Sequence, residues 1–249
     1  MIEQSTVLAV SAVVLGVLAL VFLLWTRRVP TSRRRYGYAA TLAAGAMSGT
    51  YLIMSLELLT VSTSGTEESV ARFLGYSIVW ATISYVLGAV SDAGRRYTLA
   101  LFACSMLTLW TTFAGWVLGE TGATLASVGT LAAFVGLVYL LLGPVARTAA
   151  SVSGERLLLY DKLKNLVLLA WFGLIVLGLI SQQNLALTDG FVGQVAATYI
   201  DVVLLAGFGG LVLRSGTALE QTAASTELFS ELVDTGEADA DGSGLDAAD

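Results

Sequence analysis

Long apolar stretches alternate with short polar segments along most of the chain. A helix that spans a bilayer needs roughly 20 mostly apolar residues, because lipid offers its backbone no hydrogen-bond partner. Seven stretches meet this requirement, and the pattern predicts an all-α protein: a seven-transmembrane-helix bundle that crosses the cell membrane several times and has the lipid bilayer as its surroundings. The expected spans are residues 7–25, 36–61, 70–90, 97–118, 124–145, 157–180 and 191–213.

Composition supports this fold class, and the placement of charge adds an orientation. The chain is 56% hydrophobic and 13% charged, outside the usual range of soluble domains. Loops rich in Lys and Arg stay in the cytoplasm, so we expect the N-terminus outside and the C-terminus inside. Of the basic residues, Arg72 alone falls on the outer side. The others are Arg27, Arg28, Arg33, Arg34, Arg35, Arg95, Arg96, Arg147, Arg156, Lys162, Lys164 and Arg214.

The end of the chain differs in character from the seven spans. We divide the chain into a transmembrane domain, residues 1–216, and an acidic cytoplasmic tail, residues 217–249, that is partly disordered. The tail is acidic from Glu220 onward and contains no basic residue, which suits a salt-rich cytoplasm. Residues 219–233 carry a modest apolar stripe, either a short helix for a partner or the membrane surface, or a frayed end of the last helix.

Four of the seven segments carry residues that identify a family. The last reads TYIDVVLLAGFGGLVLRS, with Asp201 near mid-membrane; the second contains RRYGYAA and TYLIMSL, with Tyr51. The third holds Trp80, and the sixth reads KLKNLVLLAW, ending at Trp171. This set resembles the microbial rhodopsins of haloarchaeal, bacteriorhodopsin-like type, in which these tyrosine and tryptophan positions line the retinal pocket. The resemblance covers residues from about 5 to 216.

The same resemblance identifies a departure at the chromophore. Family members carry, four residues after the helix-seven Asp, the lysine that forms the retinal Schiff base; here that position is Leu205. The chain's two lysines, Lys162 and Lys164, lie at one end of the sixth span. We therefore expect a divergent member that binds no covalent retinal and needs no cofactor.

The third span departs in the same direction. By alignment on Trp80, the family's counterion position falls at Val79, its arginine at Tyr76 and its proton-donor position at Val90. The resemblance therefore implies that neither proton pumping nor chloride pumping survives.

The remaining pocket residues leave alternatives open. Asp201 is either a hydrogen-bonded staple between helices or part of a sensor, held by protonation or by the hydroxyls of Tyr51 and Tyr76. Trp80 and Trp171 either flank a slot for an apolar ligand or fill a core whose ligand was lost. Together with Ser84, these residues make up the vestigial pocket, a candidate ligand site.

Two charged residues lie toward the outer ends of the second and third spans. Glu57 and Arg72 either form an ion pair at the mouth of an outward-facing pocket or are separate solvated ends.

Signatures of an enzyme, a metal site or a nucleic-acid interface do not occur in the sequence. It has no histidine, one cysteine, and no phosphate-binding glycine loop, so we expect neither catalysis nor a bound metal. The basic residues are explained by topology, so nucleic-acid binding is not expected.

Three functions fit these observations. The first is a retinal-free opsin that acts as a signal-transducing receptor or adaptor through a membrane or cytoplasmic partner protein. The sensory branch of the family relays its signal laterally through its sixth and seventh helices, which implies such a partner. The second is a structural or regulatory interaction protein, for example for a carotenoid-pathway enzyme, and the third is a noncovalent retinal or carotenoid binder. A homo-oligomer is compatible with all three.

Overall fold

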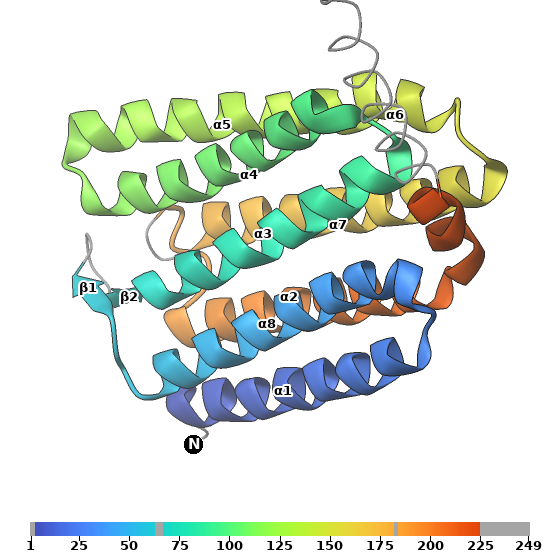
Figure 1. The fold of residues 1–249 in the computed structure, drawn as a ribbon. Coiled ribbons are helices and arrows are strands. Elements are labelled where there is room, and N and C mark those ends of the chain that lie inside the picture. The colour runs from blue at the N-terminus through green and yellow to red at the C-terminus, as the bar shows by residue number, and fades with distance from the viewer. Residues whose placement is uncertain (1–2, 63–66, 182–183, 225–249) are drawn as a thin grey trace, which may run out of the picture.

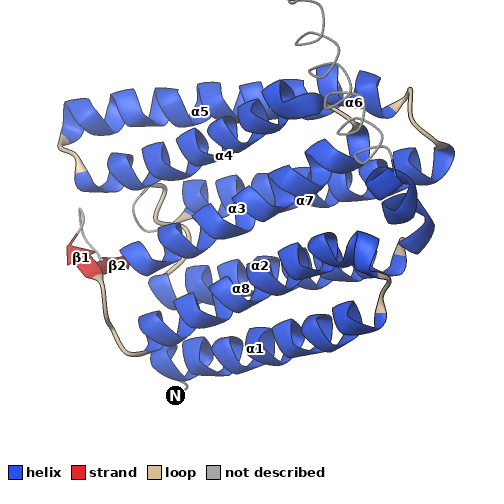
Figure 2. Ribbon diagram, in the orientation of Figure 1, coloured by secondary structure: helices blue, strands red, loops and turns tan. Residues whose placement is uncertain are grey.

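Seven long helices lie side by side in the computed structural model, which describes residues 3–62, 67–181 and 184–224 (Figure 1). The prediction of a seven-helix membrane bundle is confirmed. The long helices are α1 (Gln4–Arg28), α2 (Arg34–Ser55), α3 (Val70–Ser91), α4 (Gly94–Val117), α5 (Glu120–Leu142), α7 (Gly154–Ile180) and α8 (Gly190–Arg214). The short elements are the 3-10 turn η1 (Thr31–Arg33), the strands β1 (Thr60–Ser62) and β2 (Glu67–Ser69), and the helix α6 (Pro144–Ala149). Helices dominate the described residues (Figure 2).

Among the described residues, six helices are long and apolar enough to cross a bilayer by length and composition alone, with α5 and α6 counted together. Helix α2 is not among the six because small residues replace large apolar ones along it. Gly37 and Gly45 of α2 lie against Thr26 and Ala19 of α1, so small residues allow the two helices to approach closely. The Ser48 hydroxyl donates across that interface to the carbonyl of Ala12 at 2.7 Å. Helix α2 is therefore the seventh helix of the bundle.

The second expected span, residues 36–61, extends too far. Helix α2 ends at Ser55, and β1 pairs with β2 in an antiparallel hairpin in which Thr60 lies opposite Ser69. Residues 56–61 are mostly apolar, which is why the pattern continued through them. Glu57 and Leu59, however, have φ of 55° and 58°, left-handed conformations that no helix contains.

The fifth expected span, residues 124–145, is interrupted near its end. Helix α5 ends at Leu142, and α6 begins at Pro144 after a residue, Gly143, with non-helical dihedrals. Proline at the first position of a helix is favoured because its missing N–H has no intrahelical partner to lose. The chain therefore turns here before it reaches α7.

Charged residues divide the bundle into two ends. Arg28, Arg95 and Arg214 lie at the final or first turns of α1, α4 and α8, and we call this the arginine-rich end. The hairpin and Asp189, which caps α8 by accepting from the Val192 amide at 2.7 Å, lie at the opposite, hairpin end.

The packed part of the chain continues beyond residue 216, where the tail was expected to begin. Residues 216–224 are helical, and Leu219 and Ala223 are both 2% exposed. Glu220 forms an ion pair with Arg33 at 3.1 Å. This segment, red in Figure 1, lies against the arginine-rich end of the bundle. The rest of the expected apolar stripe, including Leu228, lies outside the described residues.

Candidate functional site

Asp201 lies near the middle of α8 and is 1% exposed. The Tyr51 hydroxyl donates to its Oδ2 at 2.6 Å, and the Tyr76 hydroxyl donates to its Oδ1 at 2.8 Å. These are the two hydroxyls that the sequence indicates as candidate partners of Asp201. Because the tyrosines belong to α2 and α3, the Asp201 side chain joins three helices through two hydrogen bonds.

Polar contacts continue from this triad toward the hairpin end. The Gln194 side-chain amide donates to the Thr198 hydroxyl at 3.2 Å, and Thr198 interacts with the Tyr51 hydroxyl. The Arg72 guanidinium donates to the side-chain amide oxygen, Oε1, of Gln194, and a carboxylate oxygen of Glu68 lies 3.9 Å from Arg72 Nη1. We call this set the polar column: Glu68, Arg72, Gln194, Thr198, Tyr51, Tyr76 and Asp201.

Arg72 thus has partners other than the one considered from the sequence. Glu57 is exposed in the turn after α2, and the described ion pair of Arg72 is with Glu68, one helical turn away. The alternative of separate ends describes Glu57 better than an ion pair does. Gln194 was missed, although it precedes Asp201 by seven residues, two turns of the same helix face.

Trp80 and Trp171 are stacked directly on each other. Their ring centroids are 4.5 Å apart, the planes are inclined by 18°, and the residues are 1% and 4% exposed. A flat ligand between two rings needs roughly 7 Å between their planes, since carbon contacts are optimal near 3.5–4.0 Å. The indoles therefore fill the space between them. Both indole N–H groups are buried with no hydrogen-bond partner in the part of the chain that the structure describes.

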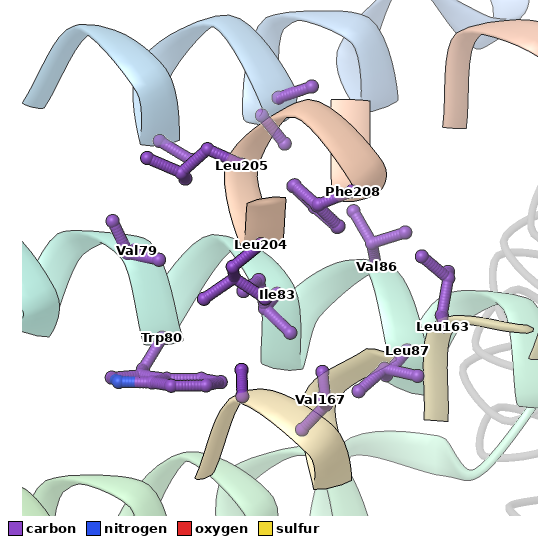
Figure 3. Close-up of a cluster of buried hydrophobic side chains, with 14 of the residues drawn as sticks. Val79, Trp80, Ile83, Val86, Leu87, Leu163, Val167, Leu204, Leu205 and Phe208 are labelled. Carbon is purple, nitrogen blue, oxygen red and sulfur yellow. The ribbon is translucent and has the colours of Figure 1, made fainter. Parts of the chain in front are cut away.

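Beyond the triad, α8 turns apolar. Leu205, one turn after Asp201, is 1% exposed and belongs to a buried cluster with Val79 and Trp80 (Figure 3). Leu204 and Phe208 extend the cluster along α8. The interior of this region is held by close packing of aliphatic and aromatic side chains.

The remaining positions identified in the sequence are Ser84, Val90 and the two lysines. Ser84 is buried on α3, one turn after Trp80. Val90 is fully buried, and its carbonyl accepts from Arg156 Nε at 3.0 Å. Both lysines lie in the third turn of α7; Lys162 is exposed, and Lys164 pairs with Asp161 at 2.6 Å.

The class of protein is a seven-helix membrane bundle, and Asp201 lies buried within it between tyrosines of two neighbouring helices. The sequence matches the family described as bacteriorhodopsin-like protein over residues 3–219. The chain belongs to this family and is a multi-pass protein of the cell membrane.

Relatives in this family include sensory proteins. Sensory rhodopsin-2 of Natronomonas pharaonis is 26% identical over 220 residues, 88% of this chain and 92% of that protein. Sensory rhodopsin-2 of Haloarcula vallismortis is 28% identical over 187 residues, 74% of this chain and 79% of that protein.

Solved structures agree in fold. The thermophilic rhodopsin from Rubrobacter xylanophilus has a TM-score of 0.83 at 21% identity, covering 89% of this chain and 100% of that chain. A light-driven proton pump from Leptosphaeria maculans has a TM-score of 0.79 at 13% identity, covering 89% of this chain and 98% of that chain.

Proposed function

We propose that this protein is a rhodopsin-like receptor or adaptor that is not photoactive and that signals through a partner protein. The observation that carries the proposal is the stacking of Trp80 on Trp171. By the resemblance to microbial rhodopsins, these two positions would lie on either side of a chromophore, and here the two rings contact each other. Leu205 extends the same closed apolar region. The pocket is thus used for packing, while the polar column remains.

The residues present do not fit covalently bound retinal. An imine needs an amine, and Leu205 supplies none at the position expected for it. Lys164 lies seven residues before Trp171 on α7 and is paired with Asp161. We propose that no imine forms in the interior of the bundle.

Ion transport is disfavoured by the same set of positions. An acceptor for a proton needs an ionisable side chain, whereas Val79 and Val90 are buried and aliphatic. Asp201 has both oxygens engaged by tyrosine hydroxyls. We propose that this carboxylate stabilises a particular helix arrangement and does not exchange protons across the membrane.

The polar column supplies a route for an input. It runs from Glu68 and Arg72 near the hairpin end to Asp201 in the middle of α8, so a small polar molecule or ion at that end can change contacts at the centre. We propose that the hairpin end faces outward and the arginine-rich end faces the cytoplasm, in keeping with the distribution of arginines.

The outward faces of α7 and α8 carry exposed side chains through which a signal can pass to a partner protein. Tyr199 is 71% exposed on α8, two residues before Asp201, and Phe172 is 62% exposed on α7. A tyrosine hydroxyl at this depth gains a hydrogen bond if a second membrane helix packs against it. We propose that a membrane-spanning partner packs on this face. The relatives named sensory rhodopsin-2 are consistent with signalling.

Co-purification tests the partner. The wild-type chain, isolated from its native membrane in mild detergent, should retain a stoichiometric membrane protein, and Tyr199→Ala should release it. Tyr139→Ala is the matched control, since Tyr139 is 62% exposed on a different helix, α5. Absence of a retained partner, or equal release by both variants, contradicts the proposal.

A second measurement separates a receptor from a structural interaction protein. Gln194→Leu interrupts the polar column without touching the α7–α8 face, so a receptor should keep its partner and lose its response. An unchanged response with a retained partner would favour the interaction protein.

Pigment reconstitution tests the remaining alternative. We expect purified wild-type protein to stay colourless with added retinal or carotenoid, and borohydride to fix no retinal in the interior, with Lys162→Arg/Lys164→Arg as the control for surface reaction. Leu205→Lys with Val79→Asp, which returns an amine and an acid, tests the pocket alignment through the appearance of a visible band. A band in the wild type would contradict the proposal.

A further inference from the structure

A groove opens at the arginine-rich end between the last turns of α1 and the end of α8. It encloses about 590 Å³. Its floor is formed by the connection from α1 to α2, which Arg34 holds in shape by donating to the carbonyl of Val29 at 2.9 Å. We call it the α1–α8 groove. It lies far along α8 from the vestigial pocket, and neither the polar column nor the tryptophan stack uses it.

One side of this groove is apolar and continues the lipid-facing surface of α1. Val21, Leu24 and Trp25 line it and are 47%, 49% and 42% exposed. Apolar side chains at this position contact lipid chains, and a tryptophan near the end of a span is typical of the membrane interface. An occupant with a hydrocarbon chain can therefore enter from the bilayer.

The other side of the groove brings together three guanidinium groups. Arg28 comes from α1, Arg33 from η1 and Arg214 from the end of α8. Among the described residues, the ion pair at this groove joins Arg33 to Glu220 at 3.1 Å, which leaves an excess of two positive charges. Arg33 Nε is buried and has no hydrogen-bond partner in the described part of the chain. A buried donor without an acceptor is costly, and an anionic group bound in the groove would supply an acceptor to Arg33.

A glycine leaves room for the Arg33 side chain at this groove. Gly216 lies against the Arg33 guanidinium, and a Cβ at that position would overlap Arg33 Nη1. The glycine thus allows Arg33 to reach the groove from η1. The arginine side chains and the open volume of the groove therefore lie together, next to the apolar residues of α1 that line it.

We propose that the α1–α8 groove binds an anionic phospholipid, with its phosphate on Arg28, Arg33 and Arg214 and one acyl chain along Val21, Leu24 and Trp25. Guanidinium groups match phosphate oxygens in geometry and charge, and basic pockets between membrane helices bind anionic head groups. The apolar wall distinguishes a lipid from free phosphate, because only a lipid fills both sides of the groove.

Quenching of tryptophan fluorescence by brominated lipid tests this directly. The full chain is placed in nanodiscs that contain brominated phosphatidylglycerol or brominated phosphatidylcholine at the same mole fraction. The signal of Trp25, one of five tryptophans, is obtained by subtraction of a Trp25→Phe variant. We expect Trp25 to prefer the anionic lipid by roughly 10- to 30-fold, since each arginine near the surface contributes on the order of 1 kcal/mol.

Two variants of equal charge locate the preference. Arg28→Gln/Arg214→Gln should bring the preference close to parity, whereas Arg95→Gln/Arg96→Gln, at the same end of the bundle on α4, should leave it unchanged. Gly216→Ala should weaken it by displacing Arg33, whereas Gly210→Ala, where a Cβ meets nothing within 4 Å, should not.

Three results would overturn the proposal. The first is equal quenching by both lipids in the wild type. The second is an equal loss of preference in the Arg95→Gln/Arg96→Gln control, which would indicate the general field of the arginine-rich end. The third is displacement of the brominated lipid by millimolar inorganic phosphate, which would assign the groove to free anions.

Discussion

Two regions meet on α8, one turn apart, and they are held together differently. Around Asp201, hydrogen bonds from Tyr51 and Tyr76 join α8 to α2 and α3 at 2.6 and 2.8 Å. Around Leu205, the same three helices and α7 meet through aliphatic and aromatic packing (Figure 3). Hydrogen bonds are directional and fix the positions of the atoms they join, whereas the apolar region depends on volume and shape.

The difference shows how one helix can carry a hydrogen-bonded centre and a closely packed apolar region on neighbouring turns. The polar region connects through Gln194 and Arg72 to the hairpin end, so it remains open to influence from that end. The apolar region is sealed by the stacked indoles of Trp80 and Trp171. Hydrogen bonding and apolar packing are therefore assigned to separate turns of α8.

The largest expected effect comes from opening the apolar region. Trp80→Ala removes a ring that is 1% exposed and stacked on Trp171, so we expect a loss of about 3–5 kcal/mol in the free energy of unfolding. Trp80→Phe retains part of the stack and should cost less. Reversible unfolding in mixed detergent micelles measures both. A loss under about 1 kcal/mol for Trp80→Ala would mean that the ring does not fill the core.

An intermediate effect is expected at the polar centre. Asp201→Leu leaves the hydroxyls of Tyr51 and Tyr76 buried without their acceptor, which should cost about 2–3 kcal/mol. The triple variant Asp201→Leu/Tyr51→Phe/Tyr76→Phe removes the orphaned hydroxyls as well and should recover most of this loss. The same unfolding assay applies. If the triple variant is no more stable than Asp201→Leu, hydrogen bonding is not what holds this region.

The smallest effect is expected toward the hairpin end. Gln194→Leu takes the amide acceptor from Arg72, at a cost of about 1 kcal/mol. Thr198→Val removes the other partner of Gln194 but leaves that acceptor in place, so its cost should be lower. If the two variants lose the same free energy of unfolding, the contact of Gln194 with Arg72 contributes no more than its contact with Thr198.

Much of this arrangement follows from the sequence because the membrane restricts the choices. Seven apolar stretches permit few structures other than a helical bundle, and a lone carboxylate within a span needs hydroxyl or cationic partners. For that reason the sequence indicates Tyr51 and Tyr76 as candidate partners of Asp201, and the structure shows both contacts.

Other features depend on distances that a one-dimensional pattern does not contain. The turn after Ser55 is apolar in sequence, and its end is set by backbone dihedrals at Glu57 and Leu59. The two tryptophans were identifiable as facing residues, but a ligand slot and a stacked pair differ only in ring separation. Gln194 is neutral and has no charge signature, so its role emerges from its contact with Arg72.

Arg156 has a consequence for motion in this bundle. It lies in the first turn of α7, is 5% exposed, and donates to the carbonyls of Val90 at 3.0 Å and Ala89 at 2.9 Å in the last turn of α3. A separation of α7 from α3 at this end would break both bonds and leave the buried carbonyl of Val90 and the partly buried carbonyl of Ala89 without this donor. This contact therefore ties the first turn of α7 to the last turn of α3 at the arginine-rich end of the bundle.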